Sequence, residues 1–458
     1  MVSENARLLW PVLEFVLQSP TGKKEKADTS TDEVTEEESS EPLWRPLNAL
    51  LRLRALEALR YREFRLLWYG QVFSSMATWM DSVARGWLIY ELTNSSFQLG
   101  LVRGVQAIPI LLLSPIAGSA ADLYSRKTQI LIAQIVDGLL YAWIAVMIIT
   151  RQIEPWHVYV TSVGLATVQS FQLPSRGSMV SDTVPPKYLT NAFGLNAVVF
   201  NSARSAGPAL AGVLIAIYGT ASAYSVQALF YLLATIWTIT LRPERRSAPG
   251  TQSHSVSGES FGRSIIEGWK FSWQNYEVRV SLLVVSAALL LLIPFTTLLP
   301  VFARDILHVG ATGQGLLLTA MGIGALLSSV VVAARGDRMP RGIVMIGGVA
   351  LYGLLVVVFA ASTWFLLSIL VMLIIGFCHV TSHALIQTVI QSYSPPEFRG
   401  RTMAIFHMTQ VIHVIGAMLV GALASLMGAR WAATSMSIAG TGAMIAIYVW
   451  MPKARTIQ

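Results

Sequence analysis

Twelve apolar segments, each long enough to cross a lipid bilayer, constrain the fold of this chain more than any other feature. They lie near 66–90, 97–121, 128–150, 156–180, 190–217, 219–241, 277–303, 311–334, 343–362, 364–391, 402–427 and 431–451. A membrane-spanning helix needs roughly 20 predominantly apolar residues. With 54% hydrophobic and 13% charged residues, the chain is also far from the soluble profile. The segments therefore predict an all-α membrane protein with about twelve transmembrane helices.

A polar stretch divides the segments into two groups of six. It begins with basic residues and continues through Ser and Gly, as a linker does. Its second part places large apolar residues at helical spacing between basic ones, which predicts a helix on the membrane surface. The expected organisation is a cytoplasmic tail over 1–61, a six-helix bundle over 62–241, a cytoplasmic linker over 242–275, a second six-helix bundle over 276–452 and a tail over 453–458.

Basic residues mark one side of the membrane. They occur in the loops after the second, fourth, sixth, eighth and tenth segments, whereas most opposite loops are short and uncharged. Arg151, Arg304 and Arg430 are exceptions at the other ends. Because Lys and Arg accumulate in loops that stay cytoplasmic, we expect a multi-pass protein of the inner (plasma) membrane with both termini cytoplasmic.

The N-terminal tail differs from the rest of the chain. Residues 28–41 are acidic and rich in Ser and Thr, with too little apolar surface to fold, so disorder is expected there. Either the tail is incidental or it contacts a partner or lipid. Residues 50–65 are basic and amphipathic, which predicts a helix at the inner membrane surface.

An internal repeat relates the two groups of segments. Three pairs of matching features occur in the same order: 122–126 with 337–341, Val-Pro-Pro-Lys-Tyr at 184–188 with Ser-Pro-Pro-Glu-Phe at 394–398, and 207–212 with 416–421. Two related bundles of this kind place a substrate site near the membrane midplane between them.

The loop at residues 118–127 resembles the signature of the major facilitator superfamily between its second and third helices. It matches that signature at Gly118, Asp122, Arg126 and Lys127, and departs from it at Ser125, where the family has Gly. A weaker second copy keeps Asp337 and Arg341. The resemblance implies the major facilitator fold, in which these charges form a clasp that closes an inner gate. The alternative is a charge cluster that only sets topology.

The fifth segment resembles the superfamily's antiporter signature at four positions, Gly194, Gly207, Pro208 and Gly212. The resemblance implies export by antiport, although small residues also serve ordinary close packing of helices. Stretches at 87–95, 106–109 and 201–208 resemble the bacterial branch that contains the enterobactin exporter and macrolide-efflux proteins. This resemblance covers roughly residues 60–452.

Ionisable residues inside the segments are costly unless they face water or a partner. Asp81 and Arg85 are four residues apart and share one helical face, so we expect an ion pair. Asp81 either carries a coupling proton, tuned by Arg85, or only neutralises that arginine; Asp137 is the second candidate carrier. The candidate cavity residues are Arg103, Arg176, Arg204, His379, His383 and His413. The excess of arginine suits an anionic or hydroxyl-rich substrate.

His379 and His383 have the spacing of metal ligands. The segments of that half supply no carboxylate beside them, and the single cysteine, Cys378, cannot form a thiolate cage, so cavity lining or proton relay is favoured and no metal or cofactor is expected. Basic residues flank the segments rather than cluster on a soluble module, which argues against nucleic-acid binding.

The sequence thus predicts a proton-coupled exporter of a small drug-like or siderophore-like molecule, functional as a monomer by alternating access. An uptake carrier and a non-transporting scaffold or sensor remain the alternatives. No H-E-x-x-H motif occurs, and the Ser, His and carboxylate residues show no nucleophile–base order that would suggest an enzyme.

Overall fold

The computed structural model describes residues 54–242 and 258–457, without the side chains of residues 54–55, 114–116, 118–123, 258–265 and 337. The predicted disordered stretch at 28–41 and the first part of the linker lie outside the described residues. The side chains of two predicted gate residues, Asp122 and Asp337, are not described either, nor are the surroundings of Gly118.

Six long helices form an N-terminal bundle. They are α3 (Arg62–Thr93), α4 (Ser96–Leu123), α5 (Arg126–Ile149), α6 (Pro155–Thr183), α7 (Leu189–Tyr218) and α8 (Thr220–Ile239). A short 3-10 helix, η1 (Arg54–Arg60), precedes them, where the sequence predicts a longer amphipathic helix. Ala58 of η1 is fully buried and its backbone N–H donates to Asn191 Oδ1 at 2.9 Å, so η1 is fixed to α7.

The C-terminal bundle repeats this arrangement with more irregular helices. It contains α12 (Gly310–Arg335), α13 (Arg341–Ala361), α14 (Phe365–Ser392), α15 (Pro396–Met408), α16 (Gln410–Met427) and α17 (Ala429–Trp450). Its first crossing consists of α10 (Tyr276–Ala287), η3 (Ala288–Leu292), η4 (Ile293–Leu298), α11 (Leu299–Val301) and η5 (Phe302–Ile306). Pro294 and Pro300 lie within this crossing, and since proline lacks an N–H donor they account for its breaks.

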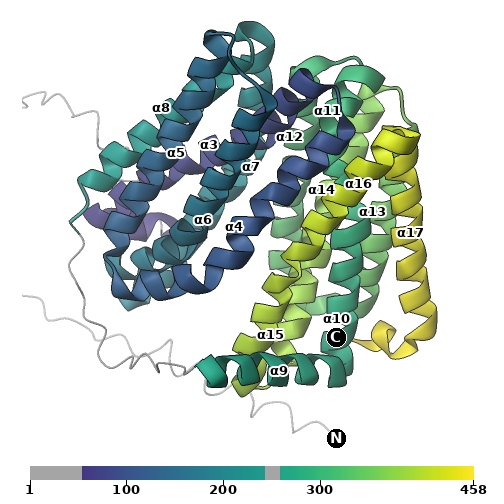
Figure 1. Cartoon of the computed structure of the whole chain (residues 1–458). Coiled ribbons are helices and arrows are strands. Elements are labelled where there is room, and N and C mark those ends of the chain that lie inside the picture. Colours follow the sequence, from purple (N-terminus) through teal and green to yellow (C-terminus); the bar gives the residue numbers. More distant parts are fainter. Residues whose placement is uncertain (1–53, 243–257, 458) are drawn as a thin grey trace, which may run out of the picture. The chain divides into compact units, whose positions relative to one another are not determined.

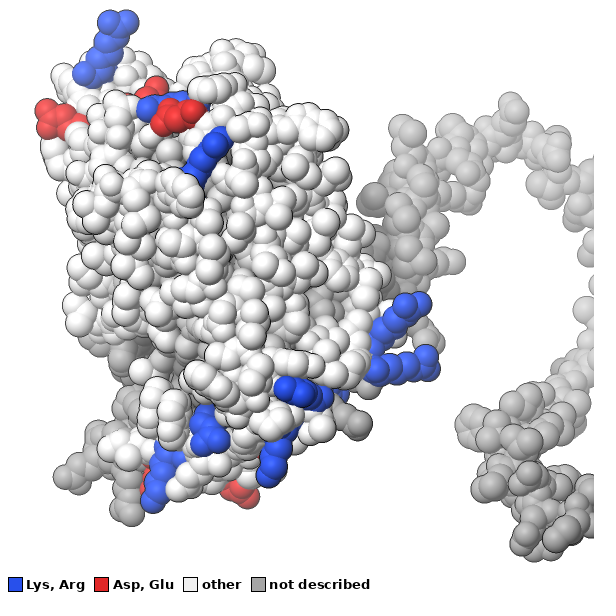
Figure 2. Space-filling view, turned by 90° about the vertical axis from the view of Figure 1, so that its right-hand side faces the viewer, with Lys and Arg blue, Asp and Glu red and all other residues white. Residues whose placement is uncertain are grey.

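Helices α15 and α16 follow each other within a single crossing, so the described residues contain twelve membrane-crossing segments. Ten of them are apolar and long enough to span a bilayer by composition alone. The other two are α3 and α6, whose hydropathy is lowered by residues such as Asp81, Arg85 and Arg176. The face shown in Figure 2 carries its charges near the two ends, with an uncharged band between them. The prediction of an all-α membrane fold with two six-helix bundles is confirmed.

A further helix, α9 (Gly258–Gln274), lies across the end of the C-terminal bundle beside α15 (Figure 1). Arg401 Nη1 of α15 binds Glu267 Oε2 of α9 at 2.9 Å. Trp269 and Trp273 stack on each other and remain half-exposed. The predicted linker helix therefore forms, with large apolar side chains left free to meet lipid.

The bundles meet at one end and separate at the other (Figure 1). We call the end that holds the loops after α4, α6, α8, α12 and α14 the basic end, because the predicted basic loops lie there. The contacts between the bundles are made mainly by α4 with α16 and by α7 with α12, with smaller contacts from α3 to α11 and α12. Gly100 and Gly212, which make two of the closest approaches, both lie toward the opposite end.

Candidate functional site

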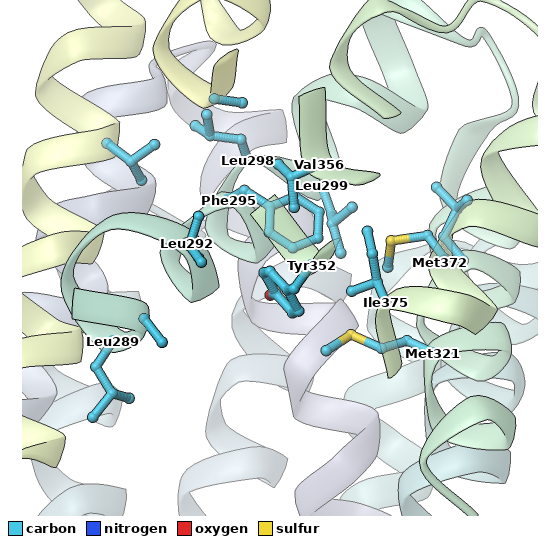
Figure 3. Close-up of a cluster of buried hydrophobic side chains, with 14 of the residues drawn as sticks. Leu289, Leu292, Phe295, Leu298, Leu299, Met321, Tyr352, Val356, Met372 and Ile375 are labelled. Carbon is cyan, nitrogen blue, oxygen red and sulfur yellow. The ribbon is translucent and has the colours of Figure 1, made fainter. Parts of the chain in front are cut away.

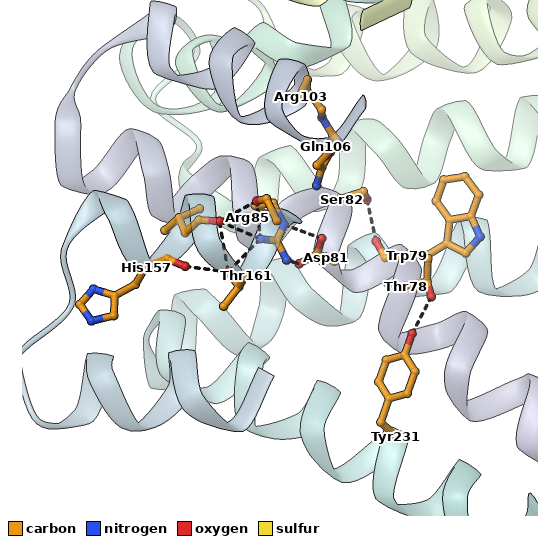
Figure 4. A network of polar contacts seen from close by, with 12 residues as sticks. Thr78, Trp79, Asp81, Ser82, Arg85, Arg103, Gln106, His157, Thr161 and Tyr231 are labelled. Carbon is orange, nitrogen blue, oxygen red and sulfur yellow. Dashed lines mark hydrogen bonds and ion pairs between the residues drawn. The ribbon is translucent and has the colours of Figure 1, made fainter. Parts of the chain in front are cut away.

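An ion pair occupies the middle of α3, as its spacing predicts. Arg85 Nε donates to Asp81 Oδ2 at 2.8 Å, and Arg85 Nη2 donates to Asp81 Oδ1 at 2.9 Å (Figure 4). This two-bond geometry matches the guanidinium fork to the carboxylate. The Arg85 side chain is 2% exposed, whereas that of Asp81 is 14% exposed.

Helix α6 completes the surroundings of Arg85. Its Nη1 donates to Ser162 Oγ at 2.8 Å, to Thr161 Oγ1 at 3.3 Å and to the Val158 carbonyl oxygen at 3.4 Å. A buried guanidinium is tolerated when its donors find acceptors in this way. Arg85 is therefore held by α6 even when Asp81 is neutral, and this support from α6 has no signature in the sequence.

A pocket lies between the bundles beside this pair. Its polar lining comes from Ser82, Arg85 and Arg103 of the N-terminal bundle and from Thr296, Thr297 and Gln314 of the C-terminal bundle. Among the described residues, Arg103 makes only a long contact with Gln106 Oε1, at 3.5 Å. It also interacts electrostatically with Asp81 and, across the interface, with His413. The pocket is thus positively charged and open to a hydrogen-bonding ligand.

Arg204 of α7 faces the other bundle. Its guanidinium lies 5.5 Å from the ring centre of Trp79 and interacts electrostatically with Tyr352 and His379. The structure therefore brings Arg103, Arg204 and the three predicted histidines to the interface between the bundles.

Two predicted residues lie instead within the N-terminal bundle. Arg176 of α6 donates to Ser74 Oγ at 2.8 Å and to the Gln71 side chain, both on α3. Asp137 is 4% exposed on α5, and its Oδ1 has no hydrogen-bond partner among the described residues. Helix α5 packs on α6 and α8, so Asp137 does not line the region between the bundles.

The described residues of the gate signature bind inside their own bundle. Arg126 Nη1 pairs with Asp182 Oδ2 of α6 at 2.8 Å. Lys127 Nζ donates to the carbonyl oxygens of Ile239 and Leu241 at 2.8 and 2.6 Å, at the end of α8. A cation is favourable there because the last carbonyls of a helix lack partners. Neither contact crosses to the other bundle.

Ser125 explains why the departure from the family's glycine is tolerated. It has a φ of −57°, which any residue adopts, and its side chain accepts from the Thr128 N–H as the N-cap of α5. Serine is a preferred N-cap residue.

Three of the four antiporter-signature positions lie in helix contacts. A Cβ added to Gly212 would lie 2.6 Å from the Ala311 carbonyl oxygen of α12, and one added to Gly315 of α12 would lie 2.5 Å from the Pro208 carbonyl oxygen. A Cβ on Gly207 would lie 2.7 Å from Trp79 of α3. Gly194, in contrast, has open space beside it.

A polar cluster joins the bundles at the end opposite the basic loops. Tyr90 donates its hydroxyl to Asp305, which Arg304 Nε also binds at 2.8 Å. Arg304 reaches back to Asn94 Oδ1 and lies 4.3 Å from the Tyr90 ring centre. Sequence reasoning missed this cluster, although the exceptional basic residue at this end was its signal.

Two apolar-walled bundles with a polar, hydrogen-bonding region between them define a membrane carrier of the major facilitator type. The chain belongs to the transmembrane secretion effector family of that superfamily, whose model matches residues 54–457. Its members are membrane transporters, so the chain is a multi-pass transport protein and not an enzyme.

Individual relatives are similar at low identity. The staphyloferrin A transporter of Staphylococcus aureus is 24% identical over 77% of this chain and 87% of its own length. The multidrug efflux pump Tap of Mycolicibacterium fortuitum is 25% identical over 86% and 96%. A Na⁺, Li⁺, K⁺/H⁺ antiporter of Planococcus maritimus is 22% identical over 80% and 92%.

Among solved structures, a bacterial homologue of the human lysosomal transporter Spinster, in an inward-facing and unoccupied conformation, has a TM-score of 0.64. It is 15% identical, and the alignment covers 87% of this chain and 96% of that one. This likeness supports the fold.

Proposed function

We propose that the protein exports a small organic molecule in exchange for protons, by alternating access in the plasma membrane, as a monomer. The Asp81–Arg85 pair carries the proposal, because a partly exposed carboxylate is bound to an arginine that lines the pocket between the bundles. Membership of the secretion effector family and the relatives' names, an efflux pump and a cation/proton antiporter, support export and proton exchange.

The basic loops assign the two ends of the carrier. Lys and Arg are retained on the cytoplasmic side, so the basic end is cytoplasmic and both termini lie there. With the bundles separated at that end, the conformation is inward-facing. The substrate enters from the cytoplasm, and the α4–α16 and α7–α12 contacts seal the outside.

Export then requires the seals to exchange. Opening the outer end separates Gly212 from α12 and breaks the cluster of Tyr90, Arg304 and Asp305. Closing the basic end brings the loops after α4 and α12 together, where Asp122, Arg126 and Lys127 act as the clasp. In the inward-facing state, Arg126 and Lys127 bind within their own bundle.

The sense of proton coupling restricts the substrate. Export driven by inward proton flow requires the proton and the substrate to exclude each other, whereas binding together gives uptake. A substrate hydroxyl meets this condition at Asp81, because it donates to the ionised carboxylate and loses that acceptor on protonation. An anion does not, since a neutral Asp81 leaves more positive charge around it. The coupling therefore favours the hydroxyl-rich substrate over the anionic one.

Proton release on substrate addition tests the proposal. Purified protein in detergent and weak buffer is mixed with a panel of drug-like and hydroxyl-rich compounds, and a pH indicator reports released protons. Compounds that are exported should release protons from the wild type but not from Asp81→Asn. The variant should still exchange the compound between the two sides of proteoliposomes, because that step needs no net proton movement.

Glu91→Gln is the matched control on the same helix. Glu91 accepts from Thr220 Oγ1 at 2.8 Å and is exposed near the outer end, so its neutralisation should leave proton release unchanged. Proton release that persists in Asp81→Asn would reject Asp81 as the carrier. A wild type that exports panel compounds without any dependence on the proton gradient would reject proton coupling altogether.

A further inference from the structure

The C-terminal bundle contains a second pocket next to its broken first crossing. Its walls come from the α10–η4 region and from α13 and α14. They are mostly apolar: Val285, Ala288, Ile293, Val349 and Ile386. Figure 3 shows Tyr352, which also lines the pocket, beside Phe295 of η4.

Two buried hydroxyl groups in this pocket lack partners. Tyr352 and Ser382 are each 2% exposed, and neither Tyr352 Oη nor Ser382 Oγ has a hydrogen-bond partner among the described residues. Burying an unbonded hydroxyl costs free energy, so native proteins seldom retain one without a reason. A ligand oxygen or nitrogen in the pocket would satisfy both groups.

The remaining polar side chains that line the pocket are uncharged, and a nearby arginine of the other bundle disfavours cations. His379 and His383 line the pocket with their rings 6.0 Å apart, and a neutral imidazole offers one donor and one acceptor. No Asp, Glu, Lys or Arg is among the described residues that line it. Arg204 of the opposite bundle acts electrostatically on both histidines, so a cationic group is disfavoured.

We propose that this pocket binds the apolar ring portion of an uncharged, hydroxyl-bearing substrate, with Tyr352 and Ser382 bonding to its polar atoms. The substrate's other hydroxyls reach Arg103 in the pocket between the bundles, and also Asp81, which is bound to the Arg85 that lines this pocket. The inference rests on the proposed export function and names its substrate class. One molecule then spans an apolar recess in the C-terminal bundle and a charged surface in the N-terminal bundle.

Three related probes test separately whether binding needs the aromatic ring and whether it tolerates a negative charge. Methylumbelliferyl glucoside carries an uncharged aromatic ring and hydroxyls, methylumbelliferyl glucuronide adds a carboxylate, and methyl glucoside lacks the ring. Binding is measured by the shift in thermal unfolding of the purified full-length protein, and transport by probe accumulation in proteoliposomes. The glucoside should bind best, the glucuronide more weakly, and methyl glucoside should give no shift.

Variants inside the pocket test its location. Val349→Trp fills the recess and should abolish binding of the glucoside. Val358→Trp, a 43% exposed position of the same helix, should leave it unchanged. Tyr352→Phe removes only the unbonded hydroxyl, so it should keep the unfolding temperature while weakening binding by about three- to tenfold.

Contradictory results are distinct from failure of export itself. Wild-type affinity in Tyr352→Phe and in Val349→Trp would overturn the pocket assignment. If Val349→Trp misfolds, wild-type affinity in Tyr352→Phe alone overturns it. Equal binding of methyl glucoside would overturn the role of the ring. If other panel compounds are exported while none of the three probes binds, the substrate class is wrong and the export function stands.

Discussion

The two bundles repeat one topology but treat buried polarity in different ways. In the N-terminal bundle two deep arginines are fixed, Arg85 by Asp81 and α6, and Arg176 by α3, whereas Asp137 Oδ1 has no partner among the described residues. In the C-terminal bundle the deep polar groups that line a pocket are neutral, and the hydroxyls of Tyr352 and Ser382 have no partner among the described residues. Under the two proposals made above, proton exchange belongs to the first bundle and recognition of an uncharged ligand to the second.

The same contrast appears where each bundle closes at the basic end. In the first, the Lys127 side chain binds the carbonyl oxygens that follow α8. At the repeat-related position of the second, the Gly342 backbone N–H donates to the Ile457 carbonyl oxygen at 3.0 Å. A charged side chain thus donates to terminal carbonyl oxygens in one copy, whereas a backbone N–H donates in the other.

The largest expected effect is loss of the fixed charge in the first bundle. Arg85→Leu leaves Asp81 without its partner, and breaking a buried pair costs roughly 3–5 kcal/mol, with the lower value expected because Asp81 is partly exposed. Thermal unfolding in detergent should show a large loss. His379→Gln, at a neutral position of the second bundle, should lose far less. Equal losses would break the comparison.

A smaller effect is expected at the contact between the bundles. Gly212→Val places carbon against the Ala311 carbonyl oxygen and should disfavour the observed conformation, in which α7 and α12 are in close contact, by about 1–3 kcal/mol. Chemical labelling of a cysteine introduced at the outer end should therefore increase. Gly194→Val, on the same helix with open space beside it, controls for the added side chain. The two variants should differ, and identical labelling would show that the close contact does not hold the outer end shut.

Removing the cation at the end of α8 should cost less again. Lys127→Met loses two hydrogen bonds and a favourable charge at a helix end, and should lower stability by about 1 kcal/mol. Because Gly342 has no charge to lose, high salt should weaken only the first bundle. Unfolding of the wild type and Lys127→Met at low and high salt measures this, and a salt effect equal in both would argue against the role of Lys127.

The smallest effect on stability belongs to the neighbouring residue. Arg126 and Asp182 are about one-third and one-quarter exposed, and such pairs contribute about 0–1 kcal/mol. Arg126→Gln should therefore leave the unfolding temperature nearly unchanged but slow export, because the clasp loses a charge. Unaltered export at normal protein levels would confine Arg126 to a topological role.

Much of the fold could be predicted from local chemistry. Span length, the linker between the sixth and seventh segments and the internal repeat depend on composition and order, which the chain states directly. The spacing of Asp81 and Arg85 fixed their pairing, since residues four apart on a helix face each other. Two segments, α3 and α6, are less apolar than the other ten, because α3 carries Asp81 and Arg85, and α6 carries Arg176 together with many Ser, Thr and Gln residues.

The sequence could not predict which candidate cavity residues line the pocket between the bundles and which lie inside one bundle. Arg103 and Arg176 are both arginines inside membrane segments, yet one lines the pocket between the bundles and the other binds α3 within its own bundle. Helical periodicity determines the face of the helix on which a residue lies. Only the packing of the other helices decides what that face contacts. The unpartnered hydroxyls of Tyr352 and Ser382 were invisible for the same reason.

The sequence by itself determined the membrane environment, the number of crossings, the two related halves and the family, because all of these follow from the order and polarity of residues along the chain. Only the tertiary structure decided which end is sealed, which charges are satisfied and where the pockets lie. Those properties depend on contacts between residues far apart in the chain, such as Gly212 with Ala311 and Arg85 with Ser162. The physical reason is that a bilayer selects each helix separately, whereas function arises from how the helices pack on one another.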